Sequence, residues 1–223
     1  MTIDKEYTSR LENVIKQMLT PLRNIPFNLV IETLTGKKVL AFDKKISDHA
    51  KILLLLEEAA IKAGNKINEK GILRPRPNEV GNDIEIFVKE ALNLKKLNAN
   101  TPIGKSGNKK AMGYPDVLFW YNEKPYYLEC KTYNAETINT TQRSFYFSPA
   151  EDFKVTHDAT HFLLSFEIYV AGERGNKHIY KTNHYKILSI ETLTVDVKYE
   201  FNSDNKRMYS TVDGTKLLAE GDL

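Results

Sequence analysis

The sequence predicts an α/β fold (α+β mixed), in which a mixed β-sheet is flanked by helices and preceded by an N-terminal helical appendage. Apolar residues recur at helical spacing through the first 92 residues, and runs rich in aromatic and β-branched residues, separated by turn signals, fill much of the remainder. The 223 residues include 41% hydrophobic residues and carry a formal net charge of only +3. This is the composition of a folded chain with a sizeable core.

Composition also excludes several classes of protein. The longest apolar run, Ile52 to Leu56, is far too short to cross a bilayer, and the polar first ten residues do not resemble a secretory signal. The single cysteine, Cys130, cannot form an internal disulfide or a cysteine-rich zinc site. We therefore expect a cytoplasmic protein with no membrane attachment.

The first 70 residues are predicted to form the helical appendage, packed on a core of residues 71–223 within one structural domain overall. Apolar residues spaced three and four apart predict an amphipathic helix over residues 7–22. Residues 27–42 form either a short hairpin around Thr35-Gly36 or begin with a helical turn. A second helix is expected from Ser47-Asp48 to about Gly64-Asn65, where glycine favours a stop.

A third helix is predicted to lead into the core. It covers residues 79–94 and has Asn78 as its N-cap. A β-hairpin follows, with strands at residues 116–121 and 126–132 and a turn between them.

The remaining elements continue the sheet. The apolar run 162–170 has strand length and is expected to lie inside the sheet, away from its edges. A helix is predicted before it, over residues 148–156, where Lys154 and Asp158 nearby either face a substrate or stabilise the helix end. A turn at 172–176 precedes strand candidates at 177–180 and 193–201.

Three charged residues of the predicted hairpin carry the chemistry. Side chains two apart on a strand point to the same face, so Glu129 and Lys131 project together, while Leu128 and Cys130 face the other side. The hairpin also brings Asp116 beside them. Placing two carboxylates and an ammonium at one end of an apolar hairpin is costly unless a partner satisfies them, and a divalent cation would do so.

This arrangement suits a metal-dependent phosphodiester hydrolase. Mg²⁺ prefers oxygen ligands and keeps several waters, so Asp116, Glu129 and the backbone carbonyl of Cys130 form a sensible partial shell for one or two ions per active site. Lys131 is within reach of a bound water, which it would either position or help to deprotonate.

The pattern Pro115-Asp116, a spacer of 12 residues and Glu129-Cys130-Lys131 resembles the PD-(D/E)XK nuclease motif, and the layout is most similar to type II restriction endonucleases. The resemblance implies a restriction-endonuclease-like core and a further acidic residue on the helix before the hairpin. We assign that role to Glu85. Glu79 and Glu90 remain alternatives, because spacing alone does not fix the rotation of the helix.

The resemblance further implies Mg²⁺-dependent cleavage of duplex DNA at a short palindromic sequence. It also implies a homodimer and a cognate DNA methyltransferase as functional partner, in the cytoplasm of a prokaryote. The first alternative is a nuclease with the same motif that acts in repair, junction resolution or a mobile element. The second is a DNA-binding module without catalysis, in which the motif is an ordinary surface hairpin with an ion pair.

Polar residues outside the motif provide candidate DNA contacts. The stretch from Lys95 to Lys110 holds five lysines and no acid, which suits phosphates as well as it suits a solvated loop. The candidates are Lys105, Lys109 and Lys110 for phosphates, Gln142, Arg143 and Ser144 for base edges or phosphates, and Asn205 in a second polar loop. His157 and His161 have an i, i+4 spacing, but hydrogen-bonded histidines are favoured there over a metal pair.

Overall fold

The computed structural model describes residues 4–107, 113–134, 136, 144–147 and 152–198. The chain divides into two compact units, residues 26–194 and residues 1–25 together with 195–223. No helix in the described ranges combines the length and apolarity needed to cross a membrane. The residues of the predicted motif all belong to the larger unit.

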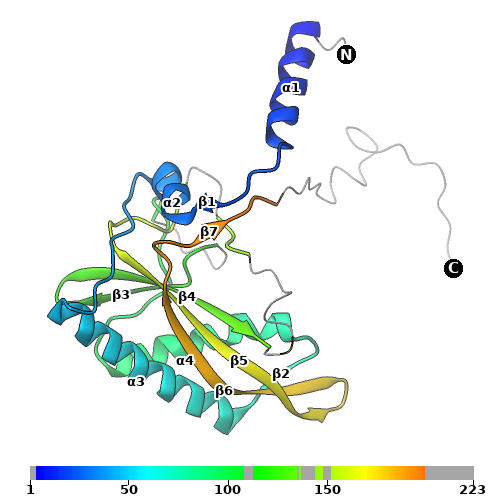
Figure 1. Cartoon of the computed structure of the whole chain (residues 1–223). Helices are drawn as coiled ribbons and strands as arrows, with labels where there is room; N and C mark the ends of the chain where they lie inside the picture. The colour runs from blue at the N-terminus through cyan, green and yellow to red at the C-terminus, as the bar shows by residue number, and fades with distance from the viewer. Residues whose placement is uncertain (1–3, 108–112, 135, 137–143, 148–151, 199–223) are drawn as a thin grey trace, which may run out of the picture. The chain divides into compact units, whose positions relative to one another are not determined.

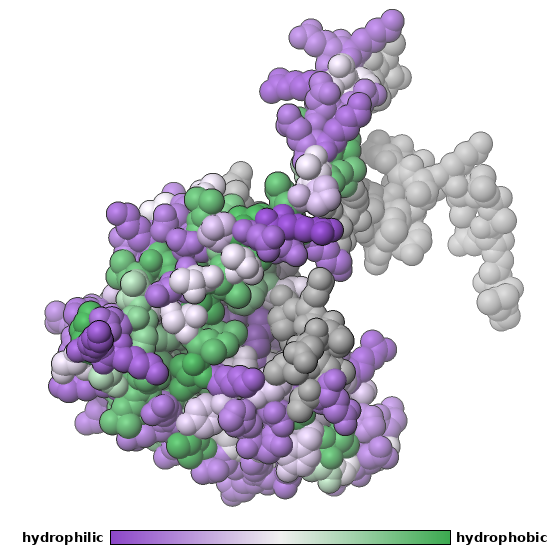
Figure 2. Space-filling view, in the orientation of Figure 1, coloured by the Kyte–Doolittle hydropathy of each residue, from purple (hydrophilic) through white to green (hydrophobic). Residues whose placement is uncertain are grey.

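The smaller unit contains helix α1 (Lys5–Met18), which confirms the predicted amphipathic helix. The side chain of Asp4 caps it by accepting a hydrogen bond from the backbone N–H of Glu6 at 3.0 Å. None of its residues is buried, and hydrophilic side chains cover most of it in Figure 2. Its apolar stripe is therefore exposed within this unit.

Strands β1 (Ile25–Pro26) and β7 (Thr194–Val195) form a two-stranded sheet. The strand predicted over residues 193–201 is therefore wrong for most of its described part, where only Thr194 and Val195 form a strand. The carboxylate of Asp196 accepts a hydrogen bond from the backbone N–H of Asn24 at 2.8 Å. Immediately after β7, a side chain therefore accepts this hydrogen bond in place of a backbone carbonyl.

The larger unit is built on a five-stranded mixed sheet, which confirms the predicted fold class (Figure 1). Its strand order is β2-β6-β5-β4-β3. Strands β4 and β5 are parallel, and the other neighbours are antiparallel. The central position of β5 confirms the expectation that the apolar run 162–170 lies inside the sheet. The strands are β2 (Ile72–Arg74), β3 (Val117–Tyr121), β4 (Lys124–Tyr133), β5 (Thr160–Arg174) and β6 (Lys177–Ser189).

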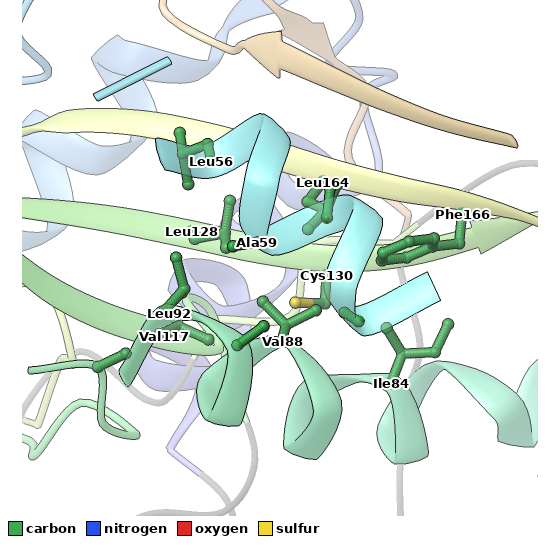
Figure 3. Close-up of a cluster of buried hydrophobic side chains, with 14 of the residues drawn as sticks. Leu56, Ala59, Ile84, Val88, Leu92, Val117, Leu128, Cys130, Leu164 and Phe166 are labelled. Carbon is green, nitrogen blue, oxygen red and sulfur yellow. The ribbon is translucent and has the colours of Figure 1, made fainter. Parts of the chain in front are cut away.

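Helices α3 (Ser47–Lys70) and α4 (Val80–Leu94) cover one face of this sheet (Figure 1). Alternate residues of β4 and β5 point into the core beneath them. Figure 3 shows the side chain of Cys130 among Val88 and Leu164, between sheet and helices. The cysteine is therefore a core thiol, as its position in the strand predicts.

Two helices differ from the sequence-based expectation. Residues Phe27–Thr35 form helix α2, so the hairpin alternative is wrong; Phe27 and Ile31, one turn apart, are both buried. Helix α3 continues past Gly64 to Lys70, because Ile67, one turn after the glycine, is also buried in the core. Gly64 therefore does not end the helix, and a Cβ at this position would make only ordinary van der Waals contact with the ring of Phe166, at 3.6 Å.

Three local predictions also need correction. Asn78 is not a side-chain cap: residues Pro77–Glu79 form a 3₁₀ turn (η1) before α4, and no side chain caps that helix. Residues 152–156 are not helical. The turn before β4 is shorter than expected, because Asn122 and Glu123 both adopt positive φ values, 47° and 62°, and complete a two-residue hairpin.

The turn before β6 is also shorter. Strand β5 extends to Arg174 and β6 begins at Lys177, so Gly175 and Asn176 alone connect them. Strand β6 correspondingly runs well beyond the predicted 177–180. The β5–β6 hairpin thus continues the sheet past the two helices.

Candidate active site

Strand β4 has an open edge where the predicted charged residues lie. Strand β3 pairs with β4 only from Lys124 to Leu128, so no strand in the described part of the chain pairs on that side from Glu129 to Tyr133. Asp116, immediately before β3, occupies this edge, and its carboxylate accepts a hydrogen bond from the backbone N–H of Cys130 at 2.8 Å. The N–H and C=O of one strand residue point to the same side, so the Cys130 carbonyl faces this edge too.

Glu129 and Lys131 project together from the sheet face opposite α3 and α4. The ammonium of Lys131 donates a hydrogen bond to Oε1 of Glu129 at 2.5 Å. Glu129 is only 3% exposed, and its Oε2 atom is buried without a hydrogen-bond partner among the described residues. A buried carboxylate oxygen left unpaired is costly, and a bound cation would satisfy it.

A cavity of about 560 Å³ adjoins this edge. Asp116 and Lys131 line it, together with Tyr133, Ser144 and, from helix α4, Glu85. The structure thus brings Glu85 to the same cavity as Asp116. Two residues that compete with Glu85 do not line it: Glu79 lies in the 3₁₀ turn, and Glu90 pairs with Lys66.

The carboxyl groups around the cavity disfavour one another's charge. Burial, reinforced by the nearby Asp116 carboxylate, raises the pKa of Glu129 and that of Glu85 to about 7. Burial also raises the pKa of Asp116, although the hydrogen bond from Cys130 and the Lys131 ammonium oppose the shift. A cation among these groups would relieve the repulsion and restore the ionised forms.

The donor set fits Mg²⁺ better than a metal held entirely by side chains. No group of three His, Cys, Asp or Glu side chains in the described part of the chain is arranged to hold an ion. Asp116 and Glu129 supply two carboxylates, and Cys130 supplies a carbonyl. Mg²⁺ characteristically takes one or two carboxylates and completes its shell with water and phosphate oxygens.

Lys154 is part of this region, which the sequence pattern did not reveal. Its side chain is 1% exposed, and its ammonium donates hydrogen bonds to the carbonyls of Gly113 at 2.6 Å and Pro115 at 3.4 Å. Lys154 therefore fixes the segment that carries Asp116, and burial lowers its pKa against the opposing influence of the nearby acids. It is neither a substrate-facing residue nor a helix-end residue.

The other sequence candidates are distributed more widely. Lys105 is exposed and lies on a loop, and its backbone N–H donates a hydrogen bond to the carbonyl of Phe153 at 3.1 Å. Asp158 accepts a hydrogen bond from the backbone N–H of Lys38. His161 is buried, and its Nδ1 lies 2.6 Å from the hydroxyl of Tyr114, as expected of a hydrogen-bonded histidine. Five candidates fall outside the described residues: Lys109, Lys110, Gln142, Arg143 and Asn205.

Comparison with known proteins places the chain in one family. The model of the type II restriction enzyme MjaV family matches residues 21–212. The chain belongs to this family. It is 37% identical over 222 residues to the type II restriction enzyme MjaV of Methanocaldococcus jannaschii, covering 92% of this chain and 94% of that protein. No solved structure matches the chain. Family membership confirms the type II restriction endonuclease predicted from the motif.

The raised pKa of Glu85 predicts a stability effect that depends on pH. In metal-free solution the unfolded chain ionises Glu85 near its ordinary pKa of 4.5, whereas the folded protein holds the proton up to about pH 7. The folded state therefore loses stability as pH rises through this window. Glu85→Gln removes the loss, and we expect the variant to gain about 1–2 kcal/mol over wild type at pH 8, after allowance for solvent screening of this partly exposed group.

Chemical denaturation in EDTA at pH 5 and pH 8 measures the difference. Glu90→Gln, on the same helix, is the matched control, because the ion pair with Lys66 lowers the pKa of Glu90. Its stability relative to wild type should not improve as the pH rises. An equal effect of Glu85→Gln at both pH values would contradict the assigned burial of this carboxyl group.

Proposed function

We propose that this protein is a Mg²⁺-dependent endonuclease that hydrolyses both strands of duplex DNA at a short palindromic sequence. In this proposal Asp116, Glu129 and the Cys130 carbonyl hold the ion, while Lys131 and Glu85 complete the active site. The unpartnered, buried Oε2 of Glu129 beside Asp116 at the open edge of β4 is the observation that carries it. The family to which the chain belongs supports the nuclease class.

When bound, the ion supplies Lewis acidity, which neutralises charge on the phosphate and favours ionisation of water. The chain's own residues do the rest. The Lys131 ammonium, oriented by Glu129, donates a hydrogen bond to the attacking water or to a phosphate oxygen. The water oxygen forms a bond to phosphorus and gives up its proton to Glu85 or to solvent, the opposite phosphorus–oxygen bond breaks, and the departing oxygen takes up a proton from solvent.

Glu85 acts from the helix side of the cavity. Its carboxyl group lies 3.8 Å from the ammonium of Lys89, which offsets part of its charge. A group with a pKa near 7 changes its protonation readily near neutral pH, as a residue that accepts or returns a proton must. We propose that Glu85 orients a water of the ion's shell and exchanges protons with it.

A nuclease of this kind needs protection for the DNA of its own cell. A short recognition sequence recurs throughout any genome, so unprotected cellular DNA would be cut. We therefore propose that a DNA methyltransferase modifying the same sequence accompanies the protein in the cytoplasm of a prokaryotic cell. The expected DNA contacts, Lys105 for phosphates and Ser144 at the cavity rim, remain part of the proposal.

Incubation of unmethylated phage or plasmid DNA with the protein and Mg²⁺ tests the function directly. We expect discrete fragments whose sequenced ends share one palindromic sequence, and no cleavage in EDTA. Preference for branched or damaged DNA over plain duplex would support a repair or junction-resolving nuclease. Absence of cleavage on all these substrates would support a binding module.

Four variants accompany this assay, three at the proposed site and one outside it. Asp116→Ala and Glu129→Ala should abolish cleavage while DNA binding persists, because each removes a proposed metal ligand and also reduces the repulsion of phosphate. Lys131→Ala should slow cleavage by about 10²–10⁴-fold. Glu90→Gln, outside the cavity, should cut at the wild-type rate. Full activity of Asp116→Ala would remove the basis of the assignment.

Cleavage of both strands at a palindrome suits a homodimer, and helix α1 supplies a candidate interface. Tyr7, Leu11, Val14 and Met18 follow the 4-3-4 spacing of a coiled-coil seam, and each is more than two-fifths exposed. Packing of the same stripe on the core of its own chain is the alternative. We expect wild type to sediment as a dimer and Leu11→Glu as a monomer, with Glu12→Gln as the control. A monomeric wild type would contradict the dimer, and a dimeric Leu11→Glu would exclude this interface.

A further inference from the structure

The sheet face that carries Glu129 and Lys131 continues across β5 onto β6. Tyr185 and Ile187 of β6 pack against the hydrophobic core beneath α3 and α4. Because side chains alternate along a strand, Lys186 between them points to the opposite face. That face is the one from which the candidate catalytic lysine projects.

Strand register aligns Lys186 with this lysine. Lys131 of β4 pairs with Ser165 of β5, and Ser165 pairs with Lys186 of β6. The three residues therefore form one row across the sheet. Two strand spacings separate the backbones of the lysines by about 10 Å. Ser165 lies between the two lysines and is 9% exposed. Its side chain is too small to stand between the two ammonium groups.

The side chain of Lys186 reaches back toward the cavity. Its ammonium lies 5.0 Å from the ring centroid of Tyr133, which is on β4 and lines the cavity. Lys186 is exposed, and no carboxylate in the described ranges lies within ion-pair distance of it. The ring of a cavity-lining tyrosine thus holds this ammonium, whose charge no described carboxylate neutralises by an ion pair.

We propose that Lys186 binds a backbone phosphate of the DNA substrate next to the scissile phosphate. The inference rests on the proposed function and assigns a substrate contact to β6. A DNA strand carries one phosphate per about 3.4 Å of helix axis, and successive phosphates are farther apart than this rise because the strand winds around the axis. A strand lying along the row would therefore bring a neighbouring phosphate to Lys186 while Lys131 faces the scissile one. A polyanion carries repeated negative charges that can pair with both lysines of the row. A protein partner with a surface of mixed charge would match the two lysines less well.

Binding of a fluorescent duplex in EDTA, where no cleavage occurs, tests the contact. The duplex carries the sequence identified from the fragment ends, and a second duplex of unrelated sequence is the comparison. We expect Lys186→Ala to weaken binding to both duplexes by about 5–10-fold and to reduce the slope of log K against log salt by about one. Lys186→Arg should restore most of the affinity, and neither variant should change the thermal midpoint, because the side chain is exposed.

Lys62→Ala is the matched control. Lys62 is an exposed lysine on α3, which covers the other face of the sheet, so its removal changes the net charge equally without touching the row. The inference is overturned if Lys186→Ala binds as wild type, if Lys62→Ala has the same effect, or if only one duplex is affected, which would indicate base recognition. If the wild type cuts DNA, any of these results overturns the Lys186 contact alone. If the wild type cuts no DNA, the proposed function and the Lys186 contact are both overturned.

Discussion

The hydrogen bond from the backbone N–H of Cys130 to the Asp116 carboxylate is the contact on which the candidate site depends. It joins the segment before β3 to the open edge of β4, and so sets the position of one acid relative to Glu129 and Lys131. The same strand residue buries its thiol in the core, which prevents β4 from shifting. A one-residue slip of the strand would exchange its two faces and carry Glu129 into the hydrophobic core.

This arrangement places acids where the protein alone satisfies them poorly. Asp116 and Glu85 line the cavity and Glu129 lies buried beside it on β4, and burial raises the pKa of each of these acids. Lys131 compensates from the sheet, and Lys154 compensates from beneath while tethering the carbonyls before Asp116. The Oε2 atom of Glu129 has no partner among the described residues, and a bound cation would relieve that cost. Poorly satisfied charges of this kind are common at active sites.

Local patterns were sufficient to predict much of this from the sequence. Alternation along β4 separated Glu129 and Lys131 from Cys130, and the aromatic hairpin placed Asp116 at the right end. The apolar run of β5 identified the central strand. Each of these predictions uses neighbours within one or two elements, where periodicity alone determines which face a side chain occupies.

The features that sequence reasoning missed depend on contacts between distant elements. Helix α3 continues past Gly64 because Ile67, one turn later, packs in the core with strand residues about a hundred positions further along the chain. Lys154 was expected near a helix end, yet its partners are the carbonyls of Gly113 and Pro115. The sequence favoured Glu85 but left Glu79 and Glu90 open, because the rotation of α4 is set by the packing of its apolar face on the sheet.

Anomalous diffraction from crystals grown with Mn²⁺, as a substitute for Mg²⁺, tests the central claim most directly. The account predicts a peak within about 2.0–2.6 Å of one carboxylate oxygen each of Asp116 and Glu129 and of the Cys130 carbonyl. Oε2 of Glu129, which has no hydrogen-bond partner among the described residues, should be the oxygen that binds. An ion bound elsewhere, with neither the Asp116 nor the Glu129 carboxylate among its ligands, would contradict it.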